Sequence, residues 1–283
     1  MMNNVEFYID ENKHTFSVDN TSEFRFGSNE VLSGKETDIS YNQPWYDEGY
    51  TEKKFLSINE FDSLTKGLVA SIRKIIEEET SIITDGFTLD KYHLYVKTDR
   101  DHYKIVSRTR DLFPNDFNFP ISELLPRLEQ ILGYKLTDIN IKDQEQLHII
   151  VRINRPRSKD FNPPHKDIYE GVDVESYIPQ FINFWIPIAG VTNNSSLPIV
   201  PRSHKINENE ILRTFEGAII EGNKYRVRMI KSWNNDCKLI RSTVGYGQVL
   251  IFSSHLIHGL AVNDEDDLTR VALEFRLFKK TEN

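Results

Sequence analysis

One long segment of the chain carries apolar residues at helical spacing. After Ser57, such residues recur every three or four positions, at Phe61, Leu64, Leu68, Ile72, Ile75 and Ile76. Ser57 and Glu60 have the spacing of a capping box, which marks the start of a helix. The pattern predicts a helix over 57–79. Shorter helices are predicted over 88–97, 100–113 and 121–133.

The hydrophobic pattern changes after residue 134. Short segments rich in β-branched and aromatic residues follow, bounded by Gly, Pro, Asn or Asp, over 147–155, 181–190, 197–201, 217–221, 224–230, 247–254 and 269–278. Strands at this density, with turn residues between them, are typical of β-sandwiches and β-barrels. We therefore expect a mixed, mainly helical support region over 1–134 and a β core over 135–283, packed together as one compact domain.

Composition narrows the class of protein. Hydrophobic residues make up 39% of the 283 residues, which is typical of a globular chain. A net charge of −8 disfavours nucleic acid as a partner, and the single cysteine, Cys237, excludes a cysteine-rich metal site. Neither a membrane-spanning apolar run nor a signal peptide is recognisable, so we expect a cytoplasmic protein without a membrane partner. The sequence carries no signal for oligomeric state.

The segment FNPPHKDIYEG (161–171) places a histidine and an aspartate two residues apart. In an extended segment, His165 and Asp167 would point to the same face because the side-chain period of a strand is two. A polar pair at the edge of any strand would have the same pattern. The pair therefore indicates a function only if partners elsewhere in the chain complete a site.

Two further histidines stand in SSHLIHG (253–259), after a predicted strand. His255 and His258 are three residues apart, so in an extended segment only one of them could face His165 and Asp167. Two histidines and one carboxylate on one face form the facial triad of non-heme Fe(II) oxygenases. The positions left open in such a triad admit an oxoacid and dioxygen.

An oxoacid with a distal carboxylate also needs a cation, and the planar fork of arginine suits it best. Arg270 opens the last predicted strand, twelve residues after His258. A hairpin through the acidic turn 263–267 would return this strand beside the one that carries His258. Arg276 has the same strand parity and is the alternative anchor.

Four elements of the sequence together resemble the phytanoyl-CoA dioxygenase-like branch of the Fe(II)/2-oxoglutarate-dependent oxygenases. They are HKD (165–167), FWIPIAGVTNNSSLPIVPRSHK (184–205), GQVLIFSSHLIHG (247–259) and Arg270. The resemblance implies a β-rich α+β fold with a double-stranded β-helix (jelly-roll) core and N-terminal supporting helices. It also implies iron ligation by His165, Asp167 and His258, 2-oxoglutarate binding by Arg270, and a cosubstrate pocket lined by Trp185. Leu260 departs from the family, which has a hydroxyl group near the distal histidine.

The predicted function is that of an Fe(II)/2-oxoglutarate-dependent dioxygenase. Such an enzyme uses O2 to hydroxylate an unactivated C–H bond and releases succinate and CO2. The alternative is a cupin-like jelly roll that binds a metal or ligand without oxygenase turnover. Production of succinate from 2-oxoglutarate would distinguish the two.

The substrate is predicted to be a polar small molecule, with an anionic group favoured by a local excess of basic residues. Candidate substrate contacts are Arg152, Asn154, Lys166 and Tyr169, which lie near the proposed iron ligands in sequence. A solvated basic loop is the alternative interpretation of the segment RINRPRSKDF (152–161).

Overall fold

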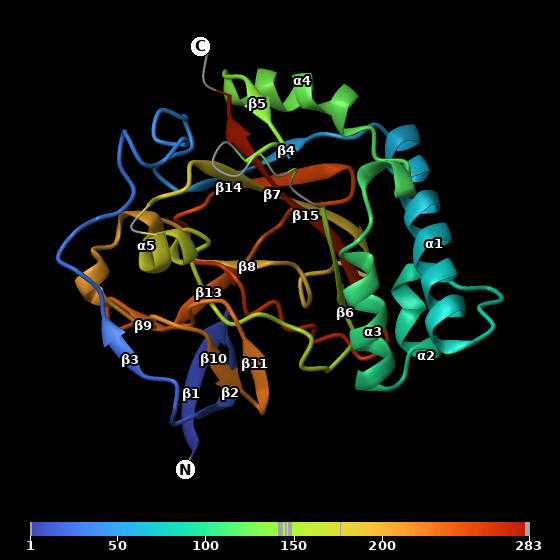
Figure 1. Cartoon of the computed structure of the whole chain (residues 1–283), viewed down its shortest axis with the longest axis horizontal. Helices are drawn as coiled ribbons and strands as arrows, with labels where there is room; N and C mark the ends of the chain where they lie inside the picture. The colour runs from blue at the N-terminus through green and yellow to red at the C-terminus, as the bar shows by residue number, and fades with distance from the viewer. Residues whose placement is uncertain (1, 141–143, 145, 147–148, 176, 281–283) are drawn as a thin grey trace.

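The computed structural model describes residues 2–140, 144, 146, 149–175 and 177–280 (Figure 1). Its strands are β1 (Met2–Ile9), β2 (Asn12–Asp19), β3 (Phe24–Phe26), β4 (Tyr50–Lys54), β5 (Leu136–Thr137), β6 (Ile150–Asn154), β7 (Phe181–Ala189), β8 (Pro198–Ile199), β9 (Ile211–Thr214), β10 (Ala218–Ile220), β11 (Asn223–Tyr225), β12 (Ile230–Trp233), β13 (Lys238–Arg241), β14 (Gln248–Ser253) and β15 (Arg270–Lys279). The helices are α1 (Ile58–Thr80), α2 (Tyr92–Tyr95), α3 (Asp99–Thr109), α4 (Ile121–Leu132) and α5 (Tyr169–Glu175), with short 3₁₀ helices η1 (Leu89–Lys91), η2 (Pro114–Phe117), η3 (Ser203–Lys205) and η4 (Glu208–Glu210).

The strands form curled sheets that face each other. One sheet has the order β4-β14-β7-β15-β5, with β6 also paired to β15. A second sheet has the order β11-β10-β2-β1-β13-β8, and a short third sheet has the order β12-β9-β3. Figure 1 shows the first sheet in the upper half of the molecule and the other two below it. The predicted β-rich α+β class with a jelly-roll core is confirmed.

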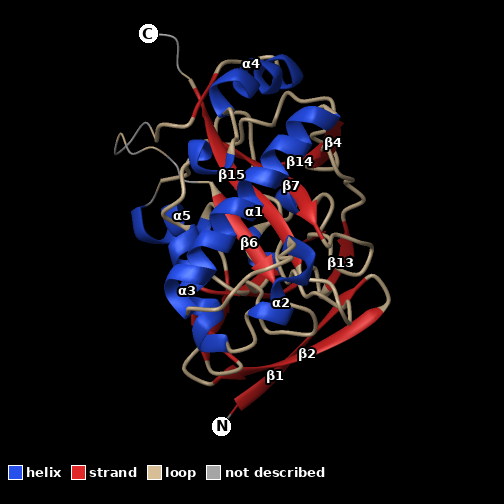
Figure 2. Cartoon of the chain, turned by 90° about the vertical axis from the view of Figure 1, so that its right-hand side faces the viewer, coloured by secondary structure: helices blue, strands red, loops and turns tan. Residues whose placement is uncertain are grey.

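Helices cover the outer face of the first sheet. Apolar residues of α1, α3 and α4 form one buried cluster with residues of β6, β7, β14 and β15, and Figure 2 shows α1 and α3 in front of these strands. The predicted long helix is confirmed as α1, with both hydrogen bonds of the Ser57–Glu60 capping box present. The prediction of N-terminal supporting helices is therefore also confirmed.

Side chains along β15 alternate between the hydrophobic core and the inside of the jelly roll. Val271, Leu273, Phe275 and Leu277 join the cluster beneath the helices. The intervening residues point to the inside of the jelly roll, because successive side chains of a strand face opposite sides. These intervening residues are Arg270, Ala272, Glu274 and Arg276. One strand thus closes the hydrophobic core on its outer face and carries charged groups on its inner face.

The predicted hairpin between the last two long strands is wrong. β14 pairs with β4 and β7, and β15 pairs with β7, β6 and β5, so β7 lies between β14 and β15. The chain that leaves β14 passes β7 before it enters β15, so no direct hairpin joins the two strands. Arg270 consequently reaches the interior beside β6 and β7.

Two further expectations concern the boundaries of elements. The predicted strand 224–230 is divided between β11 and β12, and residues 147 and 148 of the predicted strand 147–155 lie outside the described residues. Strands from the first 134 residues pair with later strands: β1 with β13, β2 with β10, β3 with β9 and β4 with β14. The division of the chain at residue 134 stays a prediction.

Gly67 allows α1 to approach η2 closely, and its replacement provides a test of this packing. A Cβ atom at this position would lie 2.4 Å from the backbone carbonyl of Phe117. Gly67→Ala should lower the free energy of unfolding by about 1–3 kcal/mol because the helix must move away. Chemical denaturation measures this loss, with Ser63→Ala on the exposed side of α1 as the control. Since Gly→Ala ordinarily stabilises a helix interior, a more stable Gly67→Ala variant would contradict the close approach.

Candidate active site

An isolated backbone bridge joins the H-x-D motif to the segment that carries His258. His165 and His258 exchange backbone hydrogen bonds of 2.9 and 3.1 Å. Asp167 lies two residues further on, in a turn that leads into α5. The expected continuous strand is therefore replaced by a bridge and a turn. The bridge sets the two histidine rings side by side, with centroids 4.4 Å apart.

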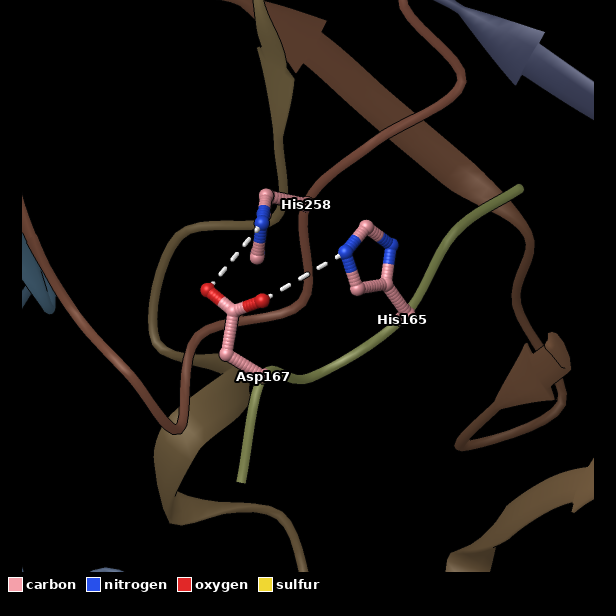
Figure 3. Close-up of side chains that lie close together, drawn as sticks. All are labelled: His165, Asp167 and His258. Carbon is pink, nitrogen blue, oxygen red and sulfur yellow. Dashed lines mark ion pairs between the residues drawn. The ribbon is translucent and has the colours of Figure 1, made fainter. Parts of the chain in front are cut away.

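His165, Asp167 and His258 converge in the structure (Figure 3). The Nε2 atom of His165 lies 3.6 Å from Oδ1 of Asp167, and Nε2 of His258 lies 3.5 Å from Oδ2. One ligand atom from each residue lies within 4.8 Å of the others, and no other such group of His, Cys, Asp and Glu occurs among the described residues. Three side chains of the expected types therefore surround a volume that could hold a metal ion.

Backbone carbonyls determine which nitrogen of each histidine faces this volume. The Nδ1 atom of His165 lies 2.7 Å from the carbonyl of Pro163, and that of His258 lies 3.0 Å from the carbonyl of Leu256. A carbonyl only accepts, so each Nδ1 carries the proton and each Nε2 presents a lone pair. Burial lowers the pKa of His258 to about 4, which keeps its imidazole neutral. This donor set fits Fe(II).

His255 lies elsewhere in the interior. Its Nδ1 atom is 3.4 Å from Oδ2 of Asp38, a carboxylate that also accepts hydrogen bonds from Ser33 and Ser253. The structure thus brings His258, and not His255, to His165 and Asp167. The two histidines face different sides, but residues 254–256 form a turn after β14, so the turn and not the parity of an extended strand separates them.

Arg270 is a buried cation without a carboxylate partner among the described residues. Its side chain donates one hydrogen bond, to Oδ1 of Asn154, while Nε and Nη1 find no acceptor in the described part of the chain. Burial, together with the nearby cations of Arg152 and Arg241, lowers the pKa of Arg270 to about 9. Buried polar groups normally have partners. The N–H groups of these two free nitrogens therefore fit a bound carboxylate such as that of an oxoacid.

Trp185 lies beside Arg270 and is also fully buried. The guanidinium carbon of Arg270 is 5.8 Å from the centroid of the indole ring. The indole N–H has no acceptor among the described residues. Trp185 thus contributes both an apolar wall and a second free donor next to the free edge of Arg270.

These side chains lie in a cavity of about 650 Å³ that opens between α3, β6 with the loop after it, and β11. His165, His258, Trp185 and Arg270 all line it. Basic side chains outnumber acidic ones in the lining: the basic ones are Arg110, Arg152, Arg155, Arg157, Lys159, Lys224 and Arg270, and the acidic ones are Asp99, Asp160 and Glu274. The cavity is therefore positively charged in a protein whose net charge is −8.

Most of the basic residues near the H-x-D motif are already paired. Arg152 lines the cavity and makes a bidentate ion pair with Glu274. The loop cations pair as well: Arg155 with Asp160 and Asp99, Arg157 with Asp266, and Lys159 with Glu221. Asn154 lines the cavity beside its cross-strand partner Arg270. Of the four predicted substrate contacts, Arg152 and Asn154 reach the cavity.

Lys166 and Tyr169 belong instead to a buried ion cluster away from the cavity. The Lys166 ammonium donates to Oε1 of Glu208 at 2.7 Å, and the Tyr169 hydroxyl donates to Oε2 of Glu208 at 2.8 Å. Arg213 stacks on the Tyr169 ring at 3.8 Å and pairs with Asp173 of α5. The prediction that Lys166 and Tyr169 contact substrate is corrected: their polar groups are occupied by Glu208, and neither residue lines the cavity.

Sequence reasoning missed Arg110 and Lys224, which line the cavity from α3's end and from β11. Neither side chain makes an ion pair or hydrogen bond within the described part of the chain. Both lie far in sequence from the recognised motifs, and exposed Arg or Lys residues are common, so the sequence offered no signal for them.

Comparison with known protein families decides the class. The sequence matches the family described as "Phytanoyl-CoA dioxygenase (PhyH)" over residues 58–270, which is most of the chain. The chain belongs to the phytanoyl-CoA dioxygenase family. Its class as a non-heme iron 2-oxoglutarate-dependent dioxygenase, predicted from the motifs, is confirmed. Enzymes of this family use Fe(II), 2-oxoglutarate and O2, which confirms the predicted cofactors.

Solved structures with a similar fold include EctD from S. alaskensis, crystallised with 2-oxoglutarate and 5-hydroxyectoine. It shares 12% identity at a TM-score of 0.48, over 93% of this chain and 86% of EctD. AviO1 from Streptomyces viridochromogenes Tue57 shares 14% identity at a TM-score of 0.46, over 90% of this chain and 98% of AviO1. A nickel complex of the non-heme monooxygenase ThoJ shares 14% identity at a TM-score of 0.42, over 86% of this chain and 77% of ThoJ. At these values we transfer no residue role from them, and no curated protein matches the sequence.

The family assignment agrees with the small-molecule substrate that the sequence predicts. Among the helices of the described residues, none is long and apolar enough to cross a membrane. In this dioxygenase, His165, His258, Trp185 and Arg270 line one cavity and Asp167 lies next to both histidines, although these residues come from four separate segments of the chain: 165–167, Trp185, His258 and Arg270.

The buried Lys166–Glu208 pair predicts a large loss of stability when it is broken. Both side chains are at most 2% exposed. Lys166→Met would remove the ammonium that lies 2.7 Å from Oε1 of Glu208 and leave only the more distant Arg213 guanidinium, 3.7 Å from Oε2, beside this buried carboxylate. We expect the free energy of unfolding of the metal-free protein to fall by about 3–5 kcal/mol. The matched control is Lys205→Met, which breaks an exposed pair with Asp47 and should change stability by less than about 1 kcal/mol. Equal losses in denaturant titrations of the two variants would refute this difference.

Proposed function

We propose that this dioxygenase hydroxylates an unactivated C–H bond of a polar, anionic small molecule and releases succinate and CO2. One observation carries the proposal: a His–Asp–His group whose atoms could hold a metal ion, and an arginine with free N–H groups, line or adjoin the same cavity. A cupin-like protein that only bound a metal would have no need for the buried, unpaired Arg270.

In this proposal, His165, Asp167 and His258 hold Fe(II) through two Nε2 atoms and one carboxylate oxygen. Pro163 and Leu256 accept hydrogen bonds from the Nδ1 atoms and thereby fix the direction of both lone pairs. When bound, Fe(II) and 2-oxoglutarate would supply the oxidising chemistry that uses O2.

Arg270 would bind the distal carboxylate of 2-oxoglutarate through its free Nε and Nη1 groups. Asn154 accepts a hydrogen bond from Nη2 of Arg270 and so holds the guanidinium plane in place. Trp185 stacks near the same guanidinium and would exclude water from the cosubstrate. Binding a dianion here would also relieve the repulsion among Arg270, Arg152 and Arg241.

The charge of the cavity supports an anionic group on the substrate. Arg110 and Lys224 lie in its lining with no carboxylate partner in the described residues, whereas the neighbouring loop cations are paired. A carboxylate or phosphate of the substrate would give these two cations a partner. The reactive carbon would then point inward, towards His165 and His258.

Replacement of Arg270 tests the cosubstrate site. Arg270→Ala should raise the Kd for 2-oxoglutarate by at least about tenfold, since it removes charge-assisted hydrogen bonds worth about 1.5–3 kcal/mol each. The Kd for Co(II), used as a redox-stable probe of the metal site, should stay nearly unchanged. Isothermal titration calorimetry measures both constants, with the exposed Arg202→Ala as the control.

An equal loss of metal and 2-oxoglutarate binding in Arg270→Ala would show that Arg270 is structural. The dioxygenase function would be refuted if the Fe(II)-loaded protein formed no succinate with any substrate pool and also bound no 2-oxoglutarate. That result would favour the cupin-like alternative.

The anionic substrate class predicts a charge-dependent stimulation of turnover. Pools of carboxylated or phosphorylated small molecules should increase succinate formation over the substrate-free rate, and pools of neutral or cationic molecules should not. Added salt should reduce the increase. Arg110→Ala and Lys224→Ala should raise the concentration needed for half-maximal stimulation, whereas Arg157→Ala, which removes an already paired cation, should have a smaller effect. Stimulation by neutral pools alone would contradict an anionic substrate.

A further inference from the structure

A cross-strand pair of side chains holds the carboxylate of Asp167. Arg276 of β15 and Asn183 of β7 lie directly opposite each other in the antiparallel register. The Arg276 guanidinium donates from Nη2 to Oδ1 of Asp167 at 2.5 Å, and the Asn183 amide donates from Nδ2 to Oδ2 at 2.7 Å. Each oxygen of the Asp167 carboxylate thus has its own donor, and the two donors form one cross-strand residue pair of the sheet.

The backbone around Asp167 does not provide this constraint. The chain makes its bridge to His258 at His165, and Asp167 already lies in the turn before α5. A carboxylate in a turn can rotate unless side chains hold it. The sheet, by contrast, is rigid at this residue pair because β7 and β15 pair along nearly their whole lengths.

The two donors are placed differently with respect to water. Asn183 is 1% exposed, whereas the Arg276 side chain is 34% exposed and stacks on Phe181, with its guanidinium carbon 4.9 Å from the ring centroid. Neither residue lines the cavity that contains Arg270 and Trp185. The Arg276 guanidinium is thus paired with Asp167 and lies outside the lining of the cavity that contains Arg270, so it is not placed to anchor an oxoacid there.

We propose that Arg276 and Asn183 are positioning residues that orient the Asp167 carboxylate for metal binding, and that Arg276 has no part in binding 2-oxoglutarate. This inference rests on the proposed role of His165, Asp167 and His258 as metal ligands. Partners of metal ligands typically change metal affinity by 10- to 100-fold when they are removed.

Arg276 has two opposing effects on a bound cation, and the sign of the measured change separates them. Its charge repels a divalent ion, so removing that charge alone would tighten metal binding. Its hydrogen bond orients Asp167, so losing that bond weakens metal binding. We expect orientation to dominate, because a misdirected carboxylate removes one of only three protein ligands.

The experiment measures Co(II) binding to the full chain by calorimetry and by visible absorption, which reports the coordination geometry. Arg276→Gln and Asn183→Leu should each raise the Kd for Co(II) by about 10- to 100-fold and alter the spectrum. Arg276→Lys keeps the charge but loses the planar fork, and it should fall between Arg276→Gln and the unmodified protein. The control on the same strand is Lys279→Ala, which should leave Co(II) binding unchanged.

Further measurements separate positioning from general damage. In an Asp167→Ala background, Arg276→Gln and Asn183→Leu should cause no additional loss of Co(II) affinity, because both act through Asp167. Each variant should also keep the 2-oxoglutarate affinity per metal-loaded protein, in contrast to Arg270→Ala. Because Arg276 and Asn183 reach different oxygens, either variant alone suffices for the test if the other does not fold.

The proposal is overturned by an unchanged Co(II) Kd and spectrum in both variants, or by tighter Co(II) binding in Arg276→Gln. Additional losses in the Asp167→Ala background would also overturn it. If the unmodified protein binds Co(II) normally, these outcomes leave the proposed function intact. If the unmodified protein binds no Co(II), the metal site fails, and the positioning role fails with it.

Discussion

The site depends on the register of β15 between β6 and β7. In this register Arg270 lies opposite Asn154, its hydrogen-bond partner, and Arg276 lies opposite Asn183, with which it holds Asp167. A shift of one residue would turn the charged face of β15 into the helix-covered core and its apolar face into the cavity. The apolar contacts under α1 therefore fix the register that the chemistry needs, since β15 presents one face to each.

The pairing of charged side chains is a second constraint on the interior of the protein. Two ion pairs are neutral as they stand: the partly buried pair of Arg152 with Glu274 and the fully buried pair of Lys166 with Glu208. Arg270 has no carboxylate partner among the described residues, and burial together with neighbouring cations lowers its pKa. A buried charge without a partner is costly for a folded protein. Its retention beside a group of metal-ligand atoms is physically reasonable when an anionic cosubstrate completes the pairing.

The H-x-D segment shows how a short motif is held when it is not part of a sheet. His165 is fixed by backbone hydrogen bonds to His258, Lys166 by Glu208 behind the site, and Asp167 by side chains from β7 and β15. The three consecutive residues are thus held by three different parts of the fold. This arrangement gives Lys166, which has no contact with the cavity, a structural role between the two proposed metal ligands.

The sequence by itself determined the fold class, the long capped helix, the candidate metal ligands and Arg270, because each depends on local periodicity, on a motif with defined spacing or on the family resemblance that these motifs carry together. Only the tertiary structure decided that β7 separates β14 from β15, that Arg276 faces Asp167, and that Arg110 and Lys224 border the cavity. These facts depend on which strands pair and in which register. Such contacts join residues that are far apart along the chain, and no local pattern of hydrophobic and polar positions records them.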